Sequence, residues 1–395
     1  MSAPDEVFYP LAVDTWGDAE RAAAIAVIES GRTTMGDKVR AFEADFAAAV
    51  GSRHAVMVNS GSSANLLAVA ALFPTREPLA RAGRVAVVPA VSWATTYYPL
   101  SQYGLTLRFV DVDPRTLNFD LAGLERALDG DVDVVFAVNL LGNPNDHDAV
   151  NSLLADRPIT LLEDNCEALG ARFGGRSAGT FGRIGTFSTF YSHHISTMEG
   201  GVCVTDDDEL FHILLSLRSH GWTRHLPWPN TLVEKDPRGG FHEAFRFILP
   251  GYNVRPMEIS GAIGIEQLKR LPGLIAARRT AAAAFRERLA EIPGVRLQRE
   301  VGESSWFGFG LILEPEVGID RDTVVARLTA SGVETRPIVA GNFVNKPVMN
   351  RLPHEPPPPL PGAREIDERG FYIGANSVDA ATLDRLIGAL AAAVA

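Results

Sequence analysis

Small and hydroxyl side chains gather where a short apolar run gives way to a helical pattern, in the segment NSGSSANLL (59–67). Gly61 would let a ligand approach the backbone closely, and Ser62 and Ser63 would add hydroxyl groups beside the free N–H groups of a helix start. Such a site can hold a phosphate group, although serine at this position is more often a simple helix cap. The segment alone leaves both interpretations open.

Two further positions could serve a flat, nitrogen-containing ring. Trp93 follows the apolar run that ends at Ala90, and its indole could stack on such a ring or simply belong to the core or its rim. Glu163 and Asp164 end another apolar run, so one of the two carboxylates should point into a crevice. A carboxylate there could keep a pyridine nitrogen protonated and make the ring an electron sink, or it could only cap the next turn.

A pair of histidines, His193 and His194, lies in the segment FSTFYSHHISTMEGG (187–201). Paired histidines suggest metal ligands first. However, adjacent residues on an extended chain face opposite ways, and the spacing offers no clear third ligand. We therefore expect no metal site.

The elements that must position these residues alternate between apolar runs and helical patterns. Alternation of this kind predicts an α/β fold with a mainly parallel sheet covered on both faces, where ligands bind beyond the carboxyl ends of the strands. Helices are expected over residues 63–73, 121–128 and 148–156. The strands are expected at residues 84–90, 106–112, 134–139, 160–165, 185–190 and 201–206.

The pattern changes after Tyr252, which predicts a large domain over residues 1–255 and a smaller α+β domain over 256–395. A long helix should begin near Met257 and break at Pro272. Short strands, a helix and a last helix from Ala380 should follow. The proline run HEPPPPLP (354–361) can be neither helix nor central strand and should form a stiff surface connection.

Composition narrows the functional classes. The 395 residues are 46% hydrophobic and 22% charged, as in globular proteins, and no signal peptide or membrane-spanning run is recognisable, so we expect a cytoplasmic protein. A net charge of −11 argues against nucleic acid as a partner. The chain contains only two cysteines, Cys166 and Cys203, too few for a four-thiolate iron–sulfur cluster.

Taken together and in this order, the segments resemble the sugar aminotransferase family, vitamin B6 enzymes of the aspartate aminotransferase fold (fold type I) that act on nucleotide-linked keto sugars. The resemblance runs from about Phe8 to Asn376. It implies pyridoxal 5'-phosphate or pyridoxamine 5'-phosphate as cofactor. It also implies a homodimer with shared sites, because Asn253 matches an asparagine that reaches the phosphate in the neighbouring subunit. The cofactor-binding residues it implies within the chain are Gly61, Ser62, Trp93, Asp164, Glu167 and Ser188, with Glu167 in the place of the usual glutamine.

The chain departs from the family at the cofactor lysine, whose position falls on His193. The four lysines, Lys38, Lys235, Lys269 and Lys346, all lie outside the segment. Imidazole forms no stable Schiff base, but it is a competent base near neutral pH. One branch of the family has this histidine, the nucleotide-sugar 3-dehydratases, and the two cysteines suggest its cluster-free, colitose-pathway type.

Resemblance to this branch implies a C3 dehydratase of a nucleotide-linked 4-keto-6-deoxyhexose, with His193 as the catalytic base. Glutamate would be the amino donor, and ammonia and a 4-keto-3,6-dideoxyhexose would be the products. Arg336, His220 and His194 are candidate substrate contacts, each with an ordinary structural role as the alternative. Two other functions stay open: a 4-keto-sugar aminotransferase and a catalytically inactive cofactor-binding homologue.

Overall fold

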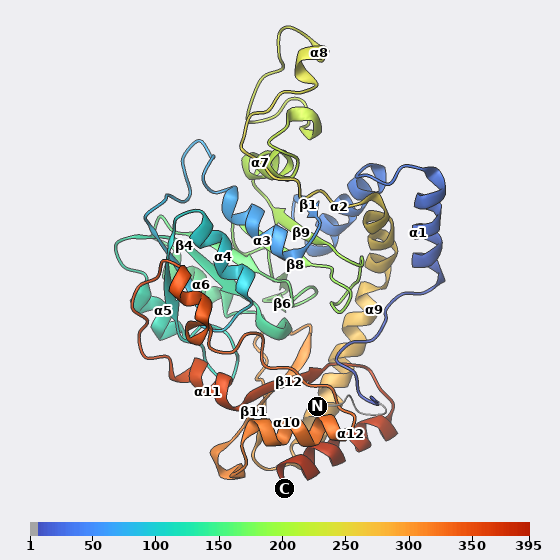
Figure 1. Ribbon diagram of the computed structural model, residues 1–395, viewed down its shortest axis with the longest axis vertical. Helices are drawn as coiled ribbons and strands as arrows, with labels where there is room; N and C mark the ends of the chain where they lie inside the picture. The colour runs from blue at the N-terminus through green and yellow to red at the C-terminus, as the bar shows by residue number, and fades with distance from the viewer. Residues whose placement is uncertain (1–6) are drawn as a thin grey trace.

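The computed structural model describes residues 7–395, and a seven-stranded sheet forms its centre (Figure 1). The strand order is β1-β9-β8-β5-β4-β2-β3, and only β9 runs antiparallel to its neighbours. The predicted mainly parallel sheet is therefore confirmed. Its strands are β1 (His54–Val58), β2 (Val85–Pro89), β3 (Thr106–Val110), β4 (Val132–Val138), β5 (Thr160–Asp164), β8 (Ile184–Ser188) and β9 (Gly201–Thr205).

Both faces of this sheet are buried because alternate side chains of each strand enter different cores. In β4, Val134 and Phe136 join one apolar cluster, whereas Val135 and Ala137 join another on the opposite face. The first cluster packs under α3 (Gly61–Ala70), α4 (Ala94–Gln102) and α7 (Asp208–Arg218). The other face is covered by α2 (Asp37–Val50), α5 (Leu121–Ala127), α6 (His147–Leu154) and part of α9 (Glu258–Leu289).

A second core lies around a three-stranded antiparallel sheet of order β10-β11-β12. Tyr9 crosses to this core and pairs with Val333, so the beginning of the described chain packs with its end. The division at residue 255 stays a prediction. The elements of this region are β10 (Val295–Leu297), β11 (Gly308–Leu313), α10 (Arg321–Ala330), α11 (Pro361–Arg369), β12 (Gly370–Gly374) and α12 (Ala380–Val394).

The predicted break at Pro272 is wrong, because α9 continues through it for 32 residues. A proline inside a helix removes one backbone hydrogen bond and costs about 3 kcal/mol. Packing offsets this cost: Leu271 and Ile275 on either side of the proline are buried in the cluster that includes Phe42 of α2. Tertiary contacts here override the local preference.

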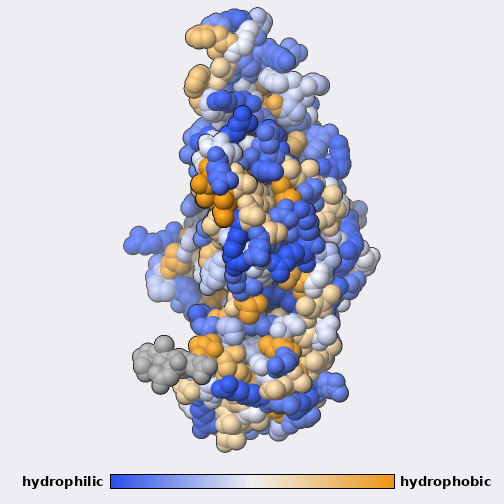
Figure 2. All heavy atoms as spheres, turned by 90° about the vertical axis from the view of Figure 1, so that its right-hand side faces the viewer, coloured by the Kyte–Doolittle hydropathy of each residue, from blue (hydrophilic) through white to orange (hydrophobic). Residues whose placement is uncertain are grey.

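An arm over residues 223–247 projects from the large sheet and carries α8 (Gly240–Glu243) at its tip (Figure 1). Its phenylalanines are unusually exposed, with Phe241 at 89% and Phe245 at 72%. Figure 2 shows this arm at the top of the molecule, with hydrophobic residues among hydrophilic ones. Among residues 7–395 there is no helix with the length and apolar character needed to span a bilayer.

Candidate active site

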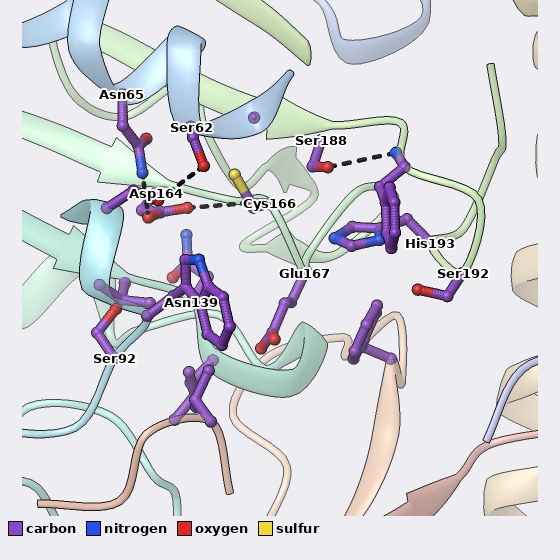
Figure 3. Close-up of a pocket in the computed structure, with 18 of the residues that line it drawn as sticks. Ser62, Asn65, Ser92, Asn139, Asp164, Cys166, Glu167, Ser188, Ser192 and His193 are labelled. Carbon is purple, nitrogen blue, oxygen red and sulfur yellow. Dashed lines mark hydrogen bonds between the residues drawn. The ribbon is translucent and has the colours of Figure 1, made fainter. Parts of the chain in front are cut away.

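A cavity of about 560 Å³ opens at the carboxyl ends of the parallel strands (Figure 3). Residues at the ends of β4, β5 and β8, and residues just after the ends of β1 and β2, line it, as expected for ligand sites in such sheets. The region of the second core closes it with Phe307, Arg336 and Tyr372. The predicted site residues that this cavity brings together are Gly61, Ser62, Trp93, Asp164, Glu167, Ser188, His193 and Arg336.

Asp164 is a buried carboxyl group of the cavity, at the end of β5. Its Oδ2 atom accepts hydrogen bonds from Asn65 Nδ2 at 2.7 Å and Thr96 Oγ1 at 2.8 Å, and its Oδ1 atom accepts one from the Cys166 N–H at 3.1 Å. Glu163 points the other way, where its oxygens accept from the Gly179 and Gly182 N–H groups.

The first turn of α3 has the small residues that a phosphate seat requires. Ser60 caps the helix by accepting a hydrogen bond from the Ser63 N–H at 3.1 Å. A Cβ atom at Gly61 would lie 2.7 Å from Ser188 Cβ and 2.9 Å from Cys166 Sγ. Only glycine therefore leaves this corner of the cavity open. The Ser62 hydroxyl is 3.0 Å from that of Thr95.

His193 lies on the loop between β8 and β9, across the cavity from Asp164 in Figure 3. Its ring is 5.9 Å from that of Phe190 and 5.0 Å from that of Phe307, both in edge-on contacts. Its Nδ1 atom is buried without a hydrogen-bond partner, and the side chain lines the cavity. Burial, reinforced by the charge of Arg278, lowers the pKa of His193 to about 3. The side chain is therefore a neutral base.

Glu167 is the second carboxyl group on this side of the cavity. Burial raises its pKa to about 7, although the Leu141 N–H donates to Oε2 at 3.0 Å and partly offsets the shift. Near neutral pH this group therefore exists in both the acid and the carboxylate form.

Three predicted residues lie outside the cavity lining of this protomer. His194 is buried behind His193, with Nε2 3.1 Å from the Ser305 carbonyl oxygen. His220 has a left-handed backbone with φ 66° and donates its N–H to Tyr252. Asn253 is exposed and accepts from Arg255 Nε at 2.9 Å.

None of the four lysines contributes to the cavity lining. Lys269 pairs with Glu266 at 2.7 Å, and the Lys235 amine lies 5.4 Å from the centre of the Trp228 ring. Within the described part of the chain, His, Cys, Asp and Glu side chains form no group of three or more placed to hold a metal ion.

Several residues of the site were not predicted. Thr96 lies three residues after Trp93 in the pattern SWATT, and Asn65 lies one helical turn after Gly61. Because both residues follow the end of a strand closely, the sequence could have predicted that they lie near the cavity. Phe307 and Tyr372 gave no such signal. They come from distant segments and reach the cavity by packing against the apolar cluster of the large sheet.

Comparison with known proteins decides the family. The model of the DegT/DnrJ/EryC1/StrS aminotransferase family matches residues 15–390. The chain belongs to this family. The predicted family and fold class are therefore confirmed.

Curated relatives of high similarity carry one activity in their names. The chain is 51% identical over 372 residues to GDP-4-keto-6-deoxy-D-mannose 3-dehydratase of Yersinia pseudotuberculosis, covering 94% of this chain and 95% of that protein. It is 50% identical to the protein of the same name from Escherichia coli O55:H7, covering 94% and 96%. These relatives agree with the predicted branch of the family.

Solved structures extend the likeness to three dimensions. The crystal structure of a GDP-4-keto-6-deoxymannose-3-dehydratase mutant with bound GDP-perosamine has a TM-score of 0.94 and 49% identity, covering 97% of this chain and all (100%) of that chain. The E. coli enzyme with bound hydrated pyridoxal phosphate has the same score and identity, covering 98% and 100%.

Proposed function

We propose that this family member is a 3-dehydratase that removes the C3 hydroxyl group of GDP-4-keto-6-deoxy-D-mannose, with pyridoxamine phosphate as cofactor and glutamate as amino donor. The observation that carries the proposal is His193, a neutral imidazole that lines the cavity while every lysine of the chain lies elsewhere. The relatives with this activity share about half of their residues with the chain over nearly its full length.

The cavity suits this cofactor on three counts. The open corner at Gly61 beside the α3 N-terminus would take the phosphate, and the exposed Trp93 indole would stack on the ring. Asp164, held by three donors, would keep the pyridine nitrogen protonated. When bound, the protonated ring supplies an electron sink for the bond breaking that follows proton removal.

The side chains of this protein would transfer the proton and position the phosphate group. His193 would take a proton at Nε2 and hold it near the departing C3 hydroxyl group, which must leave as water. Without a lysine amine, nothing in the chain competes to recapture the cofactor covalently, so hydrolysis follows. Ser62 and Ser188 would orient the phosphate, and Asn253 would reach the phosphate of the partner subunit's site, which requires a homodimer.

The overall reaction balances without an external reductase. Glutamate loses two electrons and becomes 2-oxoglutarate, its nitrogen leaves as ammonia, and its former C–N carbon gains an oxygen. The sugar gains the two electrons and loses its C3 oxygen. One glutamate is therefore consumed for each 4-keto-3,6-dideoxy sugar formed.

Substitution of His193 tests the proposal. His193→Asn should lower the rate of sugar deoxygenation by about 10²- to 10⁴-fold, the usual contribution of a general base. His193→Lys should also lose deoxygenation and gain the visible absorbance of a lysine-bound cofactor. The control is His354→Asn, because His354 is exposed and remote from the cavity. Unchanged deoxygenation in His193→Asn would refute the role of the imidazole.

An aminotransferase that stops at the 4-amino sugar is the second candidate, because the family as a whole carries that name. It would need a primary amine in the cavity, and the lining has none. We place the reaction in the cytosol, in keeping with two free cysteines, Cys166 and Cys203.

A further inference from the structure

Behind the two histidines lies a buried guanidinium with no carboxylate partner. Arg278 of α9 is 9% exposed and donates from Nη1 to the Trp306 carbonyl at 3.0 Å and the Phe307 carbonyl at 3.2 Å. Over residues 7–395, no carboxylate forms an ion pair with it. Burying an unpaired charge lowers the free energy of unfolding, so a residue of this kind is expected to have a specific role.

The segment whose carbonyl groups Arg278 binds, residues 305–307, packs against both His193 and His194. The Phe307 ring lies 5.0 Å from the His193 ring and 5.9 Å from the His194 ring. The Ser305 carbonyl oxygen is 3.1 Å from His194 Nε2. Trp306, between them, has a left-handed backbone with φ 52°, which a bulky residue adopts only when neighbouring contacts enforce it. Arg278 supplies two of these contacts.

The charge of Arg278 acts on the same imidazoles. Burial lowers the pKa of Arg278 to about 10, which leaves the side chain charged near neutral pH. After burial itself, Arg278 is the main cause that lowers the pKa of both His193 and His194. A cation fixed behind an imidazole opposes its protonation without occupying the face that meets a ligand.

Other ionisable groups also surround His193, and they come from every element around the cavity. Glu167 and Glu199 line the cavity and favour protonation when charged, whereas Arg336 at the rim opposes it. Further ionisable side chains of this region are Asp164, Cys166 and Tyr372 in the cavity lining, His194 behind His193, and Tyr191, which acts on Tyr372. Among the cations of this set, only Arg278 is buried.

We propose that Arg278 is a positioning residue for His193: it fixes the Phe307 ring against the imidazole through two backbone carbonyls and places a buried positive charge behind the imidazole. The importance of an unprotonated imidazole rests on the proposed function, whereas the effect of Arg278 on the imidazole does not.

Arg279 is a matched control on the same helix. It holds the same segment, donating from Nε to the Ser304 carbonyl at 3.0 Å, and from Nη2 to the Gly170 carbonyl at 3.1 Å. Its charge, however, is paired with Glu303 at 3.1 Å. A purely structural role for this arginine pair would make substitutions at the two positions equivalent.

The test is a titration of the histidine ring Cε1–H signals by NMR, in the purified enzyme labelled on histidine. The His193 and His194 signals are assigned from His193→Asn and His194→Asn. Arg278→Gln keeps an amide donor but removes the charge, so the His193 midpoint should rise by about one pH unit or more. Arg278→Lys should keep the midpoint low, and Arg279→Gln should leave it unchanged.

Two results would overturn the proposal: no rise in Arg278→Gln, or an equal rise in Arg279→Gln. If Arg278→Gln does not fold, the wild-type titration still decides, because a His193 midpoint at or above about 6.5, the ordinary histidine value, contradicts the proposal. Since this readout needs no turnover, a protein that lacks dehydratase activity but shows the Arg278 effect would refute the proposed function alone.

Discussion

At the scale of single residues, the pKa values of two side chains in one cavity, His193 and Glu167, are shifted in the directions that favour their uncharged forms. Burial lowers the pKa of His193 to about 3 and raises that of Glu167 to about 7. The imidazole is thus unprotonated at neutral pH, and Glu167 can donate or accept a proton. The family's usual residue at position 167, glutamine, can mimic only the protonated acid.

Glu167 predicts a pH-dependent stability. Its pKa rises on folding from 4.5 to about 7, so the folded protein binds this proton more tightly than the unfolded chain. The resulting stabilisation is complete below the unfolded pKa and is lost as the pH rises through about 7. Glu167→Gln should therefore flatten the fall in the free energy of unfolding between these values.

Urea unfolding at a series of pH values measures this effect. The midpoint of the wild-type protein should fall more steeply across the window than that of Glu167→Gln. Parallel curves for the two proteins would show that Glu167 is not shifted.

At the scale of elements, the first turn of α3 leaves no room for a side chain larger than hydrogen at Gly61. The Cβ atom of Gly61→Ala would meet the backbone-anchored Ser188 Cβ at 2.7 Å. We expect this variant to fold but to bind pyridoxal phosphate at least about tenfold more weakly, because the loop and helix must separate to fit the methyl group. Fluorescence or absorbance titration measures the affinity.

Gly388→Ala is the control for this prediction. Gly388 lies inside α12, and a Cβ atom there would meet no neighbour within 4 Å. It should stabilise the protein by about 0.5–1 kcal/mol, the helix preference for alanine, without changing cofactor affinity. Equal affinities of the Gly61→Ala variant and the wild type would contradict our account of this corner.

Elements with a strong local pattern could be predicted from the sequence. Every apolar run assigned to the large sheet became a strand, and residues at or just after the ends of β2, β4, β5 and β8 meet in one cavity. The interior of α9 could not be predicted, because its continuity through Pro272 depends on packing against α2. Likewise, β12 is a five-residue strand with glycine at each end, which leaves little pattern to recognise. The role of Arg278 could not be predicted either, because it depends on contacts among α9, residues 306–307 and the loop that carries His193.

At the scale of the whole molecule, the proposed homodimer makes each site depend on both subunits. Asn253 is exposed and outside its own cavity, as the proposal requires of a residue that serves the partner. A His193→Asn dimer and an Asn253→Ala dimer should each be weakly active. Co-expression of the two chains should restore about a quarter of wild-type activity, because half of the dimers are mixed and each has one intact site.

This complementation is measured on the unfractionated mixture, and tagged, purified mixed dimers should show about half of wild-type activity. Activity no greater than the mean of the two parent variants would show that Asn253 acts within its own subunit or not at all.

The most direct test of the central claim follows the glutamate nitrogen. Purified enzyme is incubated with GDP-4-keto-6-deoxy-D-mannose, pyridoxal phosphate and ¹⁵N-glutamate, and the products are analysed by mass spectrometry. With an imidazole in place of the cofactor lysine, we predict that all ¹⁵N appears as ammonia, in equal amount to a sugar nucleotide lighter by one oxygen atom. A stable sugar nucleotide that retains ¹⁵N, with no ammonia released, would contradict the account.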